Sequence, residues 1–263
     1  MIKHIFYKEI EPAANLKQYI FCYWYFEYKN SGKEIYPHIV LPDGCPSVIF
    51  INIANDSFKT INLFGPRLTY YKTEIPPGSK FLGIRFMPGA IKSLFGISGN
   101  DIRDRSSEAG EYFKNEKLFE YINKIEDDKK TYNGLNEIFS HTIKDDNNKP
   151  DEFVQKAVKK IIESKGKLKV SEIINEINIS ERQLLRKFKE DVGLTLKEFS
   201  RIRRNRAALF HLLIENKEKI ETVLNSGFFD QPHFNKDFSA ISGINPSEFI
   251  KLYSQIEHGN LVK

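Results

Sequence analysis

The sequence predicts an α+β fold, with an antiparallel β-rich region and two helices followed by an all-helical region. Three observations predict this order. Short runs of β-branched and aromatic residues, separated by Pro, Gly, Asn and Asp, fill residues 20–86, which is typical of a small antiparallel sandwich or barrel. From about residue 115 the apolar residues recur at helical spacing instead. A segment that begins at Val170 then recurs at an offset of fifty residues.

Composition and charge fit a protein of two domains that binds an acidic partner. The chain has 263 residues and a formal net charge of +5, and this length allows two separate cores. Residues 1–150 carry a net charge of +1 and residues 151–263 carry +4, so the basic excess lies in the half that we expect to bind phosphates.

The spacing of the cysteines and the short apolar runs predict a cytoplasmic protein without a metal cofactor. Cys22 and Cys45 form no CxxC pair or other metal-like spacing, as expected in a reducing compartment. No apolar run reaches the roughly 18 residues that cross a bilayer. The N-terminus has no signal-peptide pattern. We therefore expect no membrane partner.

The β-rich region is predicted to extend to about residue 86. Strands are expected over 21–28, 35–41, 47–53, 58–64, 68–75 and 81–86. A turn at Pro42-Asp43-Gly44 is expected to make the second and third of these strands antiparallel neighbours. A short helix then begins at Pro88 and ends near Gly96.

Two further helices and a linker are predicted to complete the first domain. Apolar stripes over 118–125 and 135–143 have helical period, and these helices either pack on their own sheet or form a homodimer. Polar, unperiodic residues 146–150 form the predicted linker. The predicted domains are therefore 1–145 and 151–263, and the second opens with a helix from Asp151 to Gly166.

The repeated segments, 170–199 and 220–249, have the pattern of helix-turn-helix units. Identical residues coincide under the offset: Phe188 with Phe238, Gly193 with Gly243, and Glu198-Phe199 with Glu248-Phe249. Within the first unit, about 168–199, a short apolar helix over 170–177 precedes Asn178, which we expect in a left-handed turn conformation. The second unit is expected over about 218–249. Ser180 and its counterpart Asp230 are predicted N-cap residues.

Each second helix is predicted to have one buried side and one side that faces DNA. Apolar residues stand four and eight positions after the cap: Leu184 and Phe188, then Phe234 and Phe238. Polar side chains on the opposite side can reach base edges. We predict base contacts by Arg182, Gln183, Arg186, Gln231, His233, Asn235 and Lys236, and Pro232 suits the first turn of its helix.

A long basic helix, 197–213, is predicted to connect the two units. A stiff connector lets the two recognition helices enter successive major grooves, about 34 Å apart. Phosphate contacts position a protein on DNA without reading its sequence. We predict such contacts by Ser180, Lys187, Lys189, Arg201, Arg204, Asn245 and Ser247. For Arg201, Arg203, Arg204 and Arg206 together, the alternative is a solvated helix face.

Residues 151–253 resemble the DNA-binding domain of the AraC/XylS family of bacterial transcription regulators. The phrases SERQLLRKF, GLTLKEF, GFFDQPHF and GINPSEF carry the resemblance. Three departures from the family pattern concern local packing. A small Ala is usual in the first helix of each unit, and here Ile174 replaces it in the first unit and Val223 or Leu224 in the second. Leu196 stands where Pro is common, and the segment 220–230 is one residue shorter than the usual family spacing. The resemblance implies sequence-specific binding to double-stranded DNA and RNA polymerase as a further partner. It also implies structural ion pairs between some α-helical arginines and acids such as Glu198.

The phrases LPDGC and GIRFMPGA are similar to the N-terminal domain of one subgroup of these regulators. This similarity implies a cupin-like module that senses a small molecule and changes DNA binding. Candidates for its pocket are Tyr23, Trp24, Tyr25, His38 and Arg85. For the aromatic strand the alternative is a core strand. For Arg85 the alternatives are an exposed sheet charge paired with a carboxylate and a pocket residue that offers its planar guanidinium to an anionic effector.

A metal-dependent cupin-type enzyme fused to a DNA-binding module is the competing hypothesis. His38, Asp43 and Cys45 lie near one another in sequence, but they are an incomplete donor set for structural zinc. The chain contains no HxH with downstream Glu and His, no phosphate-binding glycine loop, no GxSxG and no HExxH. We therefore expect a regulator and not an enzyme.

Overall fold

The structure is a computed structural model that describes residues 5–29, 34–113, 116–123, 125–143, 149–214, 227–253 and 256–258. Its first part contains the strands β1 (Ile5–Ile10), β2 (Ile20–Tyr28), β3 (Tyr36–Val40), β4 (Ser47–Ile53), β5 (Phe58–Phe64), β6 (Tyr71–Ile75), β7 (Ser79–Phe86) and β8 (Ser106–Glu108). The helices in this part are α1 (Ala90–Phe95), α2 (Gly99–Ile102), α3 (Glu116–Phe119) and α4 (Lys129–Thr142). Short 3-10 turns cover Ala14–Leu16, Ala109–Glu111 and Glu120–Asn123.

The second part is helical, apart from one short strand at its end. It contains α5 (Glu152–Glu163), α6 (Val170–Asn175), α7 (Glu181–Val192), α8 (Leu196–Ile214), α10 (Gln231–Ser242), α11 (Pro246–Tyr253) and β9 (Ile256–His258). The predicted α+β fold class, β-rich first and helical second, is confirmed. Within the described ranges, no helix combines the length and apolarity that a membrane crossing requires.

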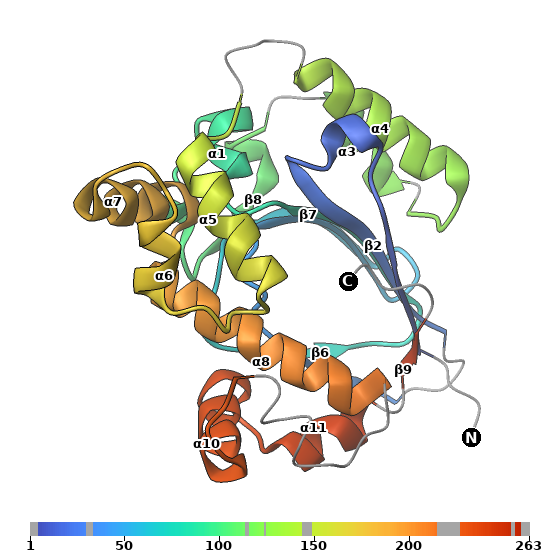
Figure 1. Ribbon diagram of the computed structural model, residues 1–263. Coiled ribbons are helices and arrows are strands. Elements are labelled where there is room, and N and C mark those ends of the chain that lie inside the picture. The colour runs from blue at the N-terminus through green and yellow to red at the C-terminus, as the bar shows by residue number, and fades with distance from the viewer. Residues whose placement is uncertain are drawn as a thin grey trace.

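Two sheets, antiparallel except where β9 pairs with β1, face each other in the N-terminal region (Figure 1). The larger has seven strands in the order β8-β5-β4-β7-β2-β1-β9, and the smaller pairs β3 with β6. Residues alternate between the faces of a strand, so β2 divides its aromatic side chains between two environments. Tyr23 and Tyr25 belong to the core cluster under the helices, while Phe26 and Trp24 belong to a cluster between the sheets.

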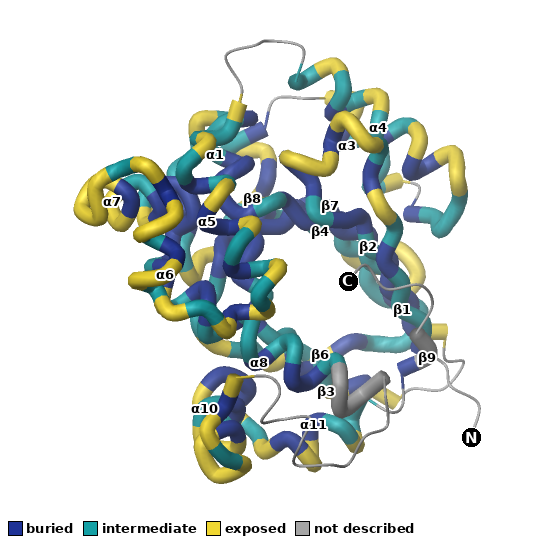
Figure 2. Tube along the Cα trace, viewed as in Figure 1, coloured by how far each residue is buried: buried dark blue, intermediate teal, exposed yellow. Residues whose placement is uncertain are grey.

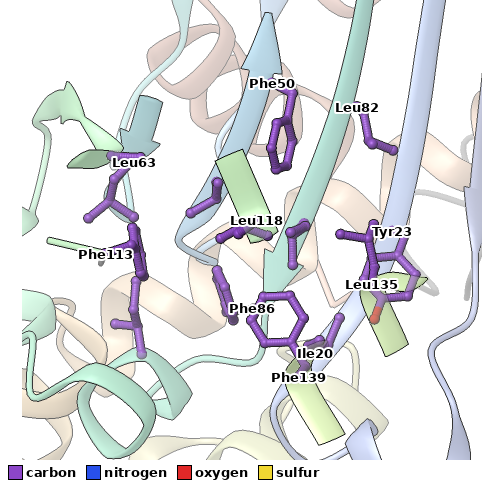
Figure 3. Close-up of a cluster of buried hydrophobic side chains, with 14 of the residues drawn as sticks. Ile20, Tyr23, Phe50, Leu63, Leu82, Phe86, Phe113, Leu118, Leu135 and Phe139 are labelled. Carbon is purple, nitrogen blue, oxygen red and sulfur yellow. The ribbon is translucent and has the colours of Figure 1, made fainter. Parts of the chain in front are cut away.

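The main core lies between the large sheet and the helices α3 and α4. Figure 3 shows Phe86 of β7 close to Phe139 of α4, and their rings meet edge to face at 5.8 Å. Leu135 and Phe139 are fully buried in this cluster. Of the two alternatives for the helix over 135–143, packing on the chain's own sheet is the arrangement observed for α4. α4 therefore covers the face of the large sheet that points away from the smaller sheet.

The prediction that residues 35–41 and 47–53 are antiparallel neighbours is wrong. β3 pairs with β6, whereas β4 pairs with β5 and β7. Pro42 and Pro46 have no amide hydrogen for a hairpin ladder, and the intervening chain crosses from one sheet to the other. Gly44, with φ +77°, makes this crossing close to the helical half, since a Cβ there would lie 2.5 Å from the Phe199 ring.

Two hydrophobic clusters hold the helical half together. One joins α5, α6, α7 and the start of α8, and the other joins the middle of α8 to α10 and α11. The expected left-handed conformation of Asn178 is not observed, because its φ is not positive. Instead the amide of Ile179 donates to the Ile177 carbonyl at 2.7 Å and closes the turn more tightly. Residues 215–226, with the first helix of the second predicted unit, lie outside the described residues.

The helical half is docked closely on the β-rich region, and the contact surface is largely buried (Figure 2). The amide of Tyr70 donates to the Ile241 carbonyl at 2.8 Å, and the side-chain amide of Gln155 donates to the Pro88 carbonyl at 2.9 Å. β9 adds a parallel strand beside β1. The large sheet is therefore completed by a strand that follows the predicted linker in sequence. Residues 146–148 of that linker lie outside the described ranges.

Candidate nucleic-acid interface and effector cavity

α7 is the first candidate recognition helix, and its N-cap is formed as expected. Ser180 Oγ accepts a hydrogen bond from the Gln183 amide at 3.4 Å. Leu184 and Phe188 are fully buried below the helix. On the opposite side Arg182, Gln183 and Arg186 are exposed, and the Arg186 side chain is 66% exposed. The predicted base-contacting residues of the first unit are therefore all accessible.

α10 repeats this arrangement in the second unit. Asp230 accepts a hydrogen bond from the His233 amide at 2.7 Å, and Pro232 stands in the first turn. Phe234 and Phe238 are buried, while the four candidate base contacts, Gln231, His233, Asn235 and Lys236, are exposed. Preceding the helix, Phe229 is 86% exposed. Sequence reasoning missed this aromatic side chain, although its place beside the N-cap was visible in the phrase GFFDQPHF.

α8 fixes the relation between the two recognition helices. Figure 1 shows α7 and α10 along the same side of the molecule, at successive positions along α8. Arg201 Nε of α8 donates to Asp237 Oδ1 of α10 at 2.6 Å, and Asn205 Nδ2 donates to Asp237 Oδ2 at 2.7 Å. These side-chain hydrogen bonds hold α10 against α8, and the apolar cluster to which both helices contribute adds further contacts.

The candidate phosphate contacts fall into two groups. Lys189, Asn245 and Ser247 are exposed, and Ser180 lies at the first turn of α7. Lys187, by contrast, pairs with Asp151, which also caps α5. Arg201 pairs with Asp237, and Arg204 lies over the Phe228 ring at 5.2 Å. These last three cations therefore have structural contacts inside the helical half.

Glu198 does not pair with an arginine of α8, contrary to what the resemblance implied. Its carboxylate accepts hydrogen bonds from Arg103 of the N-terminal region, with Nη2 to Oε1 at 2.9 Å. It also accepts from the Thr195 amide at 2.8 Å, which caps the start of α8. Burial would raise the pKa of Glu198, but these hydrogen bonds and the Arg103 charge lower it. The partner came from a distant part of the chain, so helical spacing alone could not identify it.

A cavity of about 410 Å³ lies between the two sheets, within the range of small-molecule sites. Its walls include Ile49 and Ile51 of β4, Thr73 and Ile75 of β6, and Phe81 of β7. The helical half contributes Arg206, Leu209 and Phe210 from α8, Phe249 and Tyr253 from α11, and Ile256 from β9. Sequence reasoning missed these residues because no local pattern marks a helix as the wall of a cavity in another domain.

Three of the five candidate effector residues, Trp24, His38 and Arg85, line this cavity. Tyr23 and Tyr25 do not, and the inclusion of these two in the pocket needs correction. Alternation along β2 turns them to the helix-covered face, where Tyr23 stacks on Tyr132 of α4 at 6.1 Å. Every position from 21 to 26 except Cys22 is aromatic, so no alternation of polarity marked the cavity side.

Arg85 is paired with carboxylates of its own chain. Its Nη1 donates to Glu9 Oε1 at 2.7 Å, its Nε lies 2.6 Å from Asp43 Oδ2, and its Nη2 donates to Tyr7 Oη at 3.4 Å. Burial would raise the pKa of Glu9, but the Arg85 charge and the Tyr7 hydroxyl lower it, so this carboxylate stays ionised. Arg85 thus combines parts of the two alternatives: it is paired with carboxylates, as the first predicted, but it is buried and lines the cavity instead of being exposed on the sheet.

His38, Asp43 and Cys45 were the possible metal ligands in the sequence. In the structure, Asp43 and Cys45 make other contacts. Asp43 Oδ1 accepts from the Cys45 amide at 2.9 Å, and Oδ2 belongs to the Arg85 pair. Burial raises the pKa of the Cys22 thiol to about 12 and also raises that of Cys45, which disfavours the thiolate that binds metals. Over the described ranges, no group of three or more His, Cys, Asp or Glu has metal-binding geometry.

Among the described cavity residues, Trp24 Nε1 and His38 Nδ1 are buried without a hydrogen-bond partner, and Arg85 Nε has only its ion pair with Asp43. The Trp24 indole lies across Gly83 of β7, where a Cβ would come within 1.9 Å of Cε2. His38 is surrounded by the rings of Phe26, Tyr36 and Tyr253 at 5.5, 5.7 and 5.8 Å. Buried polar groups normally find a partner, so these two atoms are exceptions to that rule within the described residues.

His38 is expected to make stability depend on pH. Burial lowers the pKa of its imidazole to about 4, from an ordinary value of 6.5. Between these values the unfolded chain binds a proton that the folded chain does not, so the free energy of unfolding should fall as the pH falls, by up to about 1.4 kcal/mol per pH unit. Urea titrations at pH 7 and pH 5 should reveal this loss. A His38→Leu variant should lack it; an equal loss in that variant would contradict the assignment.

Two family models match separate parts of the chain. Residues 8–108 match a family described as a domain of unknown function (DUF6597). Residues 173–251 match a family described as a helix-turn-helix domain. The second half is a helix-turn-helix domain of the AraC type. The AraC-type domain therefore contains both candidate recognition helices, α7 and α10.

A curated relative and two solved structures are similar to this chain over different lengths. The Msm operon regulatory protein of Streptococcus mutans is 37% identical over 98 residues, covering 36% of this chain and 34% of its own length. The chain thus matches about a third of that curated relative. ToxT of Vibrio cholerae O395, solved with (E)-4-(8-methylnaphthalen-1-yl)but-3-enoic acid, has 14% identity and a TM-score of 0.45, covering 84% of this chain and 98% of ToxT. The C-terminal domain of AraT, a response regulator of Geobacillus stearothermophilus, has 22% identity and a TM-score of 0.35, covering 38% and 85%.

Proposed function

We propose that the chain is a sequence-specific DNA-binding transcription regulator whose AraC-type domain reads two successive major-groove half-sites. The single observation that carries the proposal is the pair of capped helices, α7 and α10, which expose polar side chains on one side of α8. Such helices suit direct recognition of base edges. A cytoplasmic location, a contact with RNA polymerase and a homodimer belong to the same proposal, and no enzymatic step is included.

The first test of this proposal is Arg186→Ala. Arg186 has five hydrogen-bond donors and can pair bidentately with guanine O6 and N7, so its loss should cost about 1–3 kcal/mol and relax the preference at that base. Gel-shift titrations on a site selected from random DNA would measure both effects. Lys189→Ala is the matched control: Lys189 is exposed on the same helix, and its loss should weaken binding evenly and reduce the salt dependence. Full affinity and full base preference in Arg186→Ala would contradict the assignment.

We further propose that a small molecule in the cavity adjusts DNA binding. The walls of the cavity come from both halves of the chain, so an occupant would contact the cavity-lining strands and α8 at once. A ligand can shift a conformational equilibrium only by contacts that differ between its states, and contacts to two docked domains satisfy this condition. Most of the lining is apolar, which favours a largely apolar effector.

Trp24 provides a direct test, because it is the only tryptophan of the chain. Titration with a panel of small apolar molecules that carry a hydrogen-bond acceptor should change its fluorescence for those that bind. Ile51→Phe, which adds volume to the cavity wall, should abolish the change. The proposal requires that a compound detected in this way also alters DNA affinity, and it would be rejected if DNA binding ignored every such compound.

A further inference from the structure

The N-terminal region contacts the first recognition helix at its C-terminal end. Lys92 of α1 donates from Nζ to Glu190 Oε1 at 2.5 Å and to Asp191 Oδ1 at 2.7 Å. Ser98, the N-cap residue of α2, donates from Oγ to the Glu190 carbonyl at 2.9 Å. One cation from the β-rich region therefore lies between two carboxylates of α7.

Glu190 also contacts the residue to which we assign a base. Arg186 lies one helical turn earlier, and its Nη1 donates to Glu190 Oε2 at 3.3 Å. The two oxygens of Glu190 thus have different partners, Lys92 on one and Arg186 on the other. The Lys92 hydrogen bond and charge are the main causes that lower the pKa of Glu190, and Arg186 adds a smaller effect. Lys92 is therefore the stronger of the two partners.

Without Lys92, the cation that remains hydrogen-bonded to this carboxylate would be Arg186. An arginine that holds a carboxylate through both oxygens gives up the planar, bidentate donor set that guanine recognition requires. An uncompensated pair of carboxylates, Glu190 and Asp191, would also repel DNA phosphates that approach the end of α7. Both effects act in the same direction and would weaken DNA binding.

We propose that Lys92 is a positioning residue for DNA recognition: from the N-terminal region it engages one oxygen of Glu190 and so limits Arg186 to a single hydrogen bond with the other oxygen, which DNA bases can displace. The inference rests on the proposed function, because it presumes that Arg186 contacts DNA. It assigns to the N-terminal region a direct part in base preference, through a side chain that does not itself touch DNA.

Only a few residues of the chain separate the cavity-lining strand β7 from Lys92, which contacts Glu190. β7 carries the cavity residues Phe81 and Arg85 and ends at Phe86. Four residues later, at Ala90, α1 begins, and Lys92 is its third residue. Gly89, with φ +86°, makes the turn between them. A displacement of β7 by an occupant of the cavity would therefore move Lys92 relative to α7.

The test uses the full chain and a DNA site selected with it. Lys92→Met should lower affinity for that site by about tenfold, the size expected for coupling between contacting charged residues. The loss should be concentrated at the base pair whose identity Arg186→Ala ceases to distinguish. Lys92→Arg, which keeps the charge, should behave as the parent chain. Adding Glu190→Gln to Lys92→Met should restore affinity to within about twofold, because the competing carboxylate is then absent.

Ser98→Ala is the control for docking, since it removes a neutral hydrogen bond at the same place and changes no charge. It should leave base preference unchanged, and thermal unfolding of each variant reports whether the domains stay folded. The proposal is overturned if Lys92→Met binds as the parent chain does, if it loses affinity evenly over all sites, or if Glu190→Gln fails to restore it.

Two further measurements distinguish a failure of the proposed role of Lys92 from a failure of the proposed DNA-binding function. Should Lys92→Met not fold, Glu190→Gln alone decides: it should sharpen the preference at the Arg186 base pair, and an unchanged preference would refute the role of Lys92. Failure of the parent chain to prefer any DNA sequence would instead refute the proposed function itself, and the inference with it.

Discussion

Gly99→Ala should separate the AraC-type domain from the β-rich region without unfolding either. Gly99 is the first residue of α2 and lies against the end of α7. A Cβ there would lie 2.5 Å from the Asp191 carbonyl oxygen and 2.6 Å from the Gly193 amide nitrogen. These are backbone atoms at a helix end, so no side-chain rotation relieves the contact. We expect a loss of about 3 kcal/mol in the docking of the two parts, at the upper end of the usual cost of overpacking.

Small-angle scattering and calorimetry would detect this separation. The radius of gyration should increase, and one cooperative unfolding transition should resolve into two. Gly110→Ala is the matched control, because a Cβ at Gly110 meets nothing within 4 Å. If Gly99→Ala stayed as compact as Gly110→Ala and melted in one transition, the close approach of α2 and α7 would not be what holds the domains together.

The elements that the sequence predicted well are those whose signals are local. The N-caps Ser180 and Asp230 and the buried positions Leu184 and Phe234 stand at fixed short spacings. A helix of this kind depends on capping and on one apolar stripe, and both can be recognised within a dozen residues. The fifty-residue repeat then supplied independent support, since each unit predicts the other.

The features that could not be predicted depend on contacts between distant residues. Asp237 engages Arg201, and Glu198 engages Arg103, and in each case other acids were equally plausible partners from spacing alone. The cavity needs a wall from α8 and α11, yet the apolar residues that form it look like ordinary core positions. Pairing of β3 with β6 likewise depends on a crossing between sheets, and the local turn signal at Pro42-Asp43-Gly44 favoured a hairpin instead.

Phe238→Ala should cost about 3–5 kcal/mol, the range for removing a fully buried phenylalanine ring. Phe238 is completely buried, and its ring contacts those of Phe234 and Phe249 at 5.6 Å each. Its counterpart Phe188 is equally buried but belongs to the larger of the two helical clusters. The same deletion therefore removes a larger share of the contacts that hold α10, so the second unit should lose its structure first.

A comparison of Phe238→Ala with Phe188→Ala by hydrogen exchange and DNase footprinting would measure the difference. In Phe238→Ala, protection of amides in α10 and of the second half-site should fall, while α7 and the first half-site keep theirs. Lys236→Ala is the control for base contacts, since Lys236 is exposed on the same helix and its loss should leave exchange unchanged. Equal loss of both half-sites in Phe238→Ala would mean that the two units unfold as one, because α8, which both clusters share, would then transmit the loss to α7.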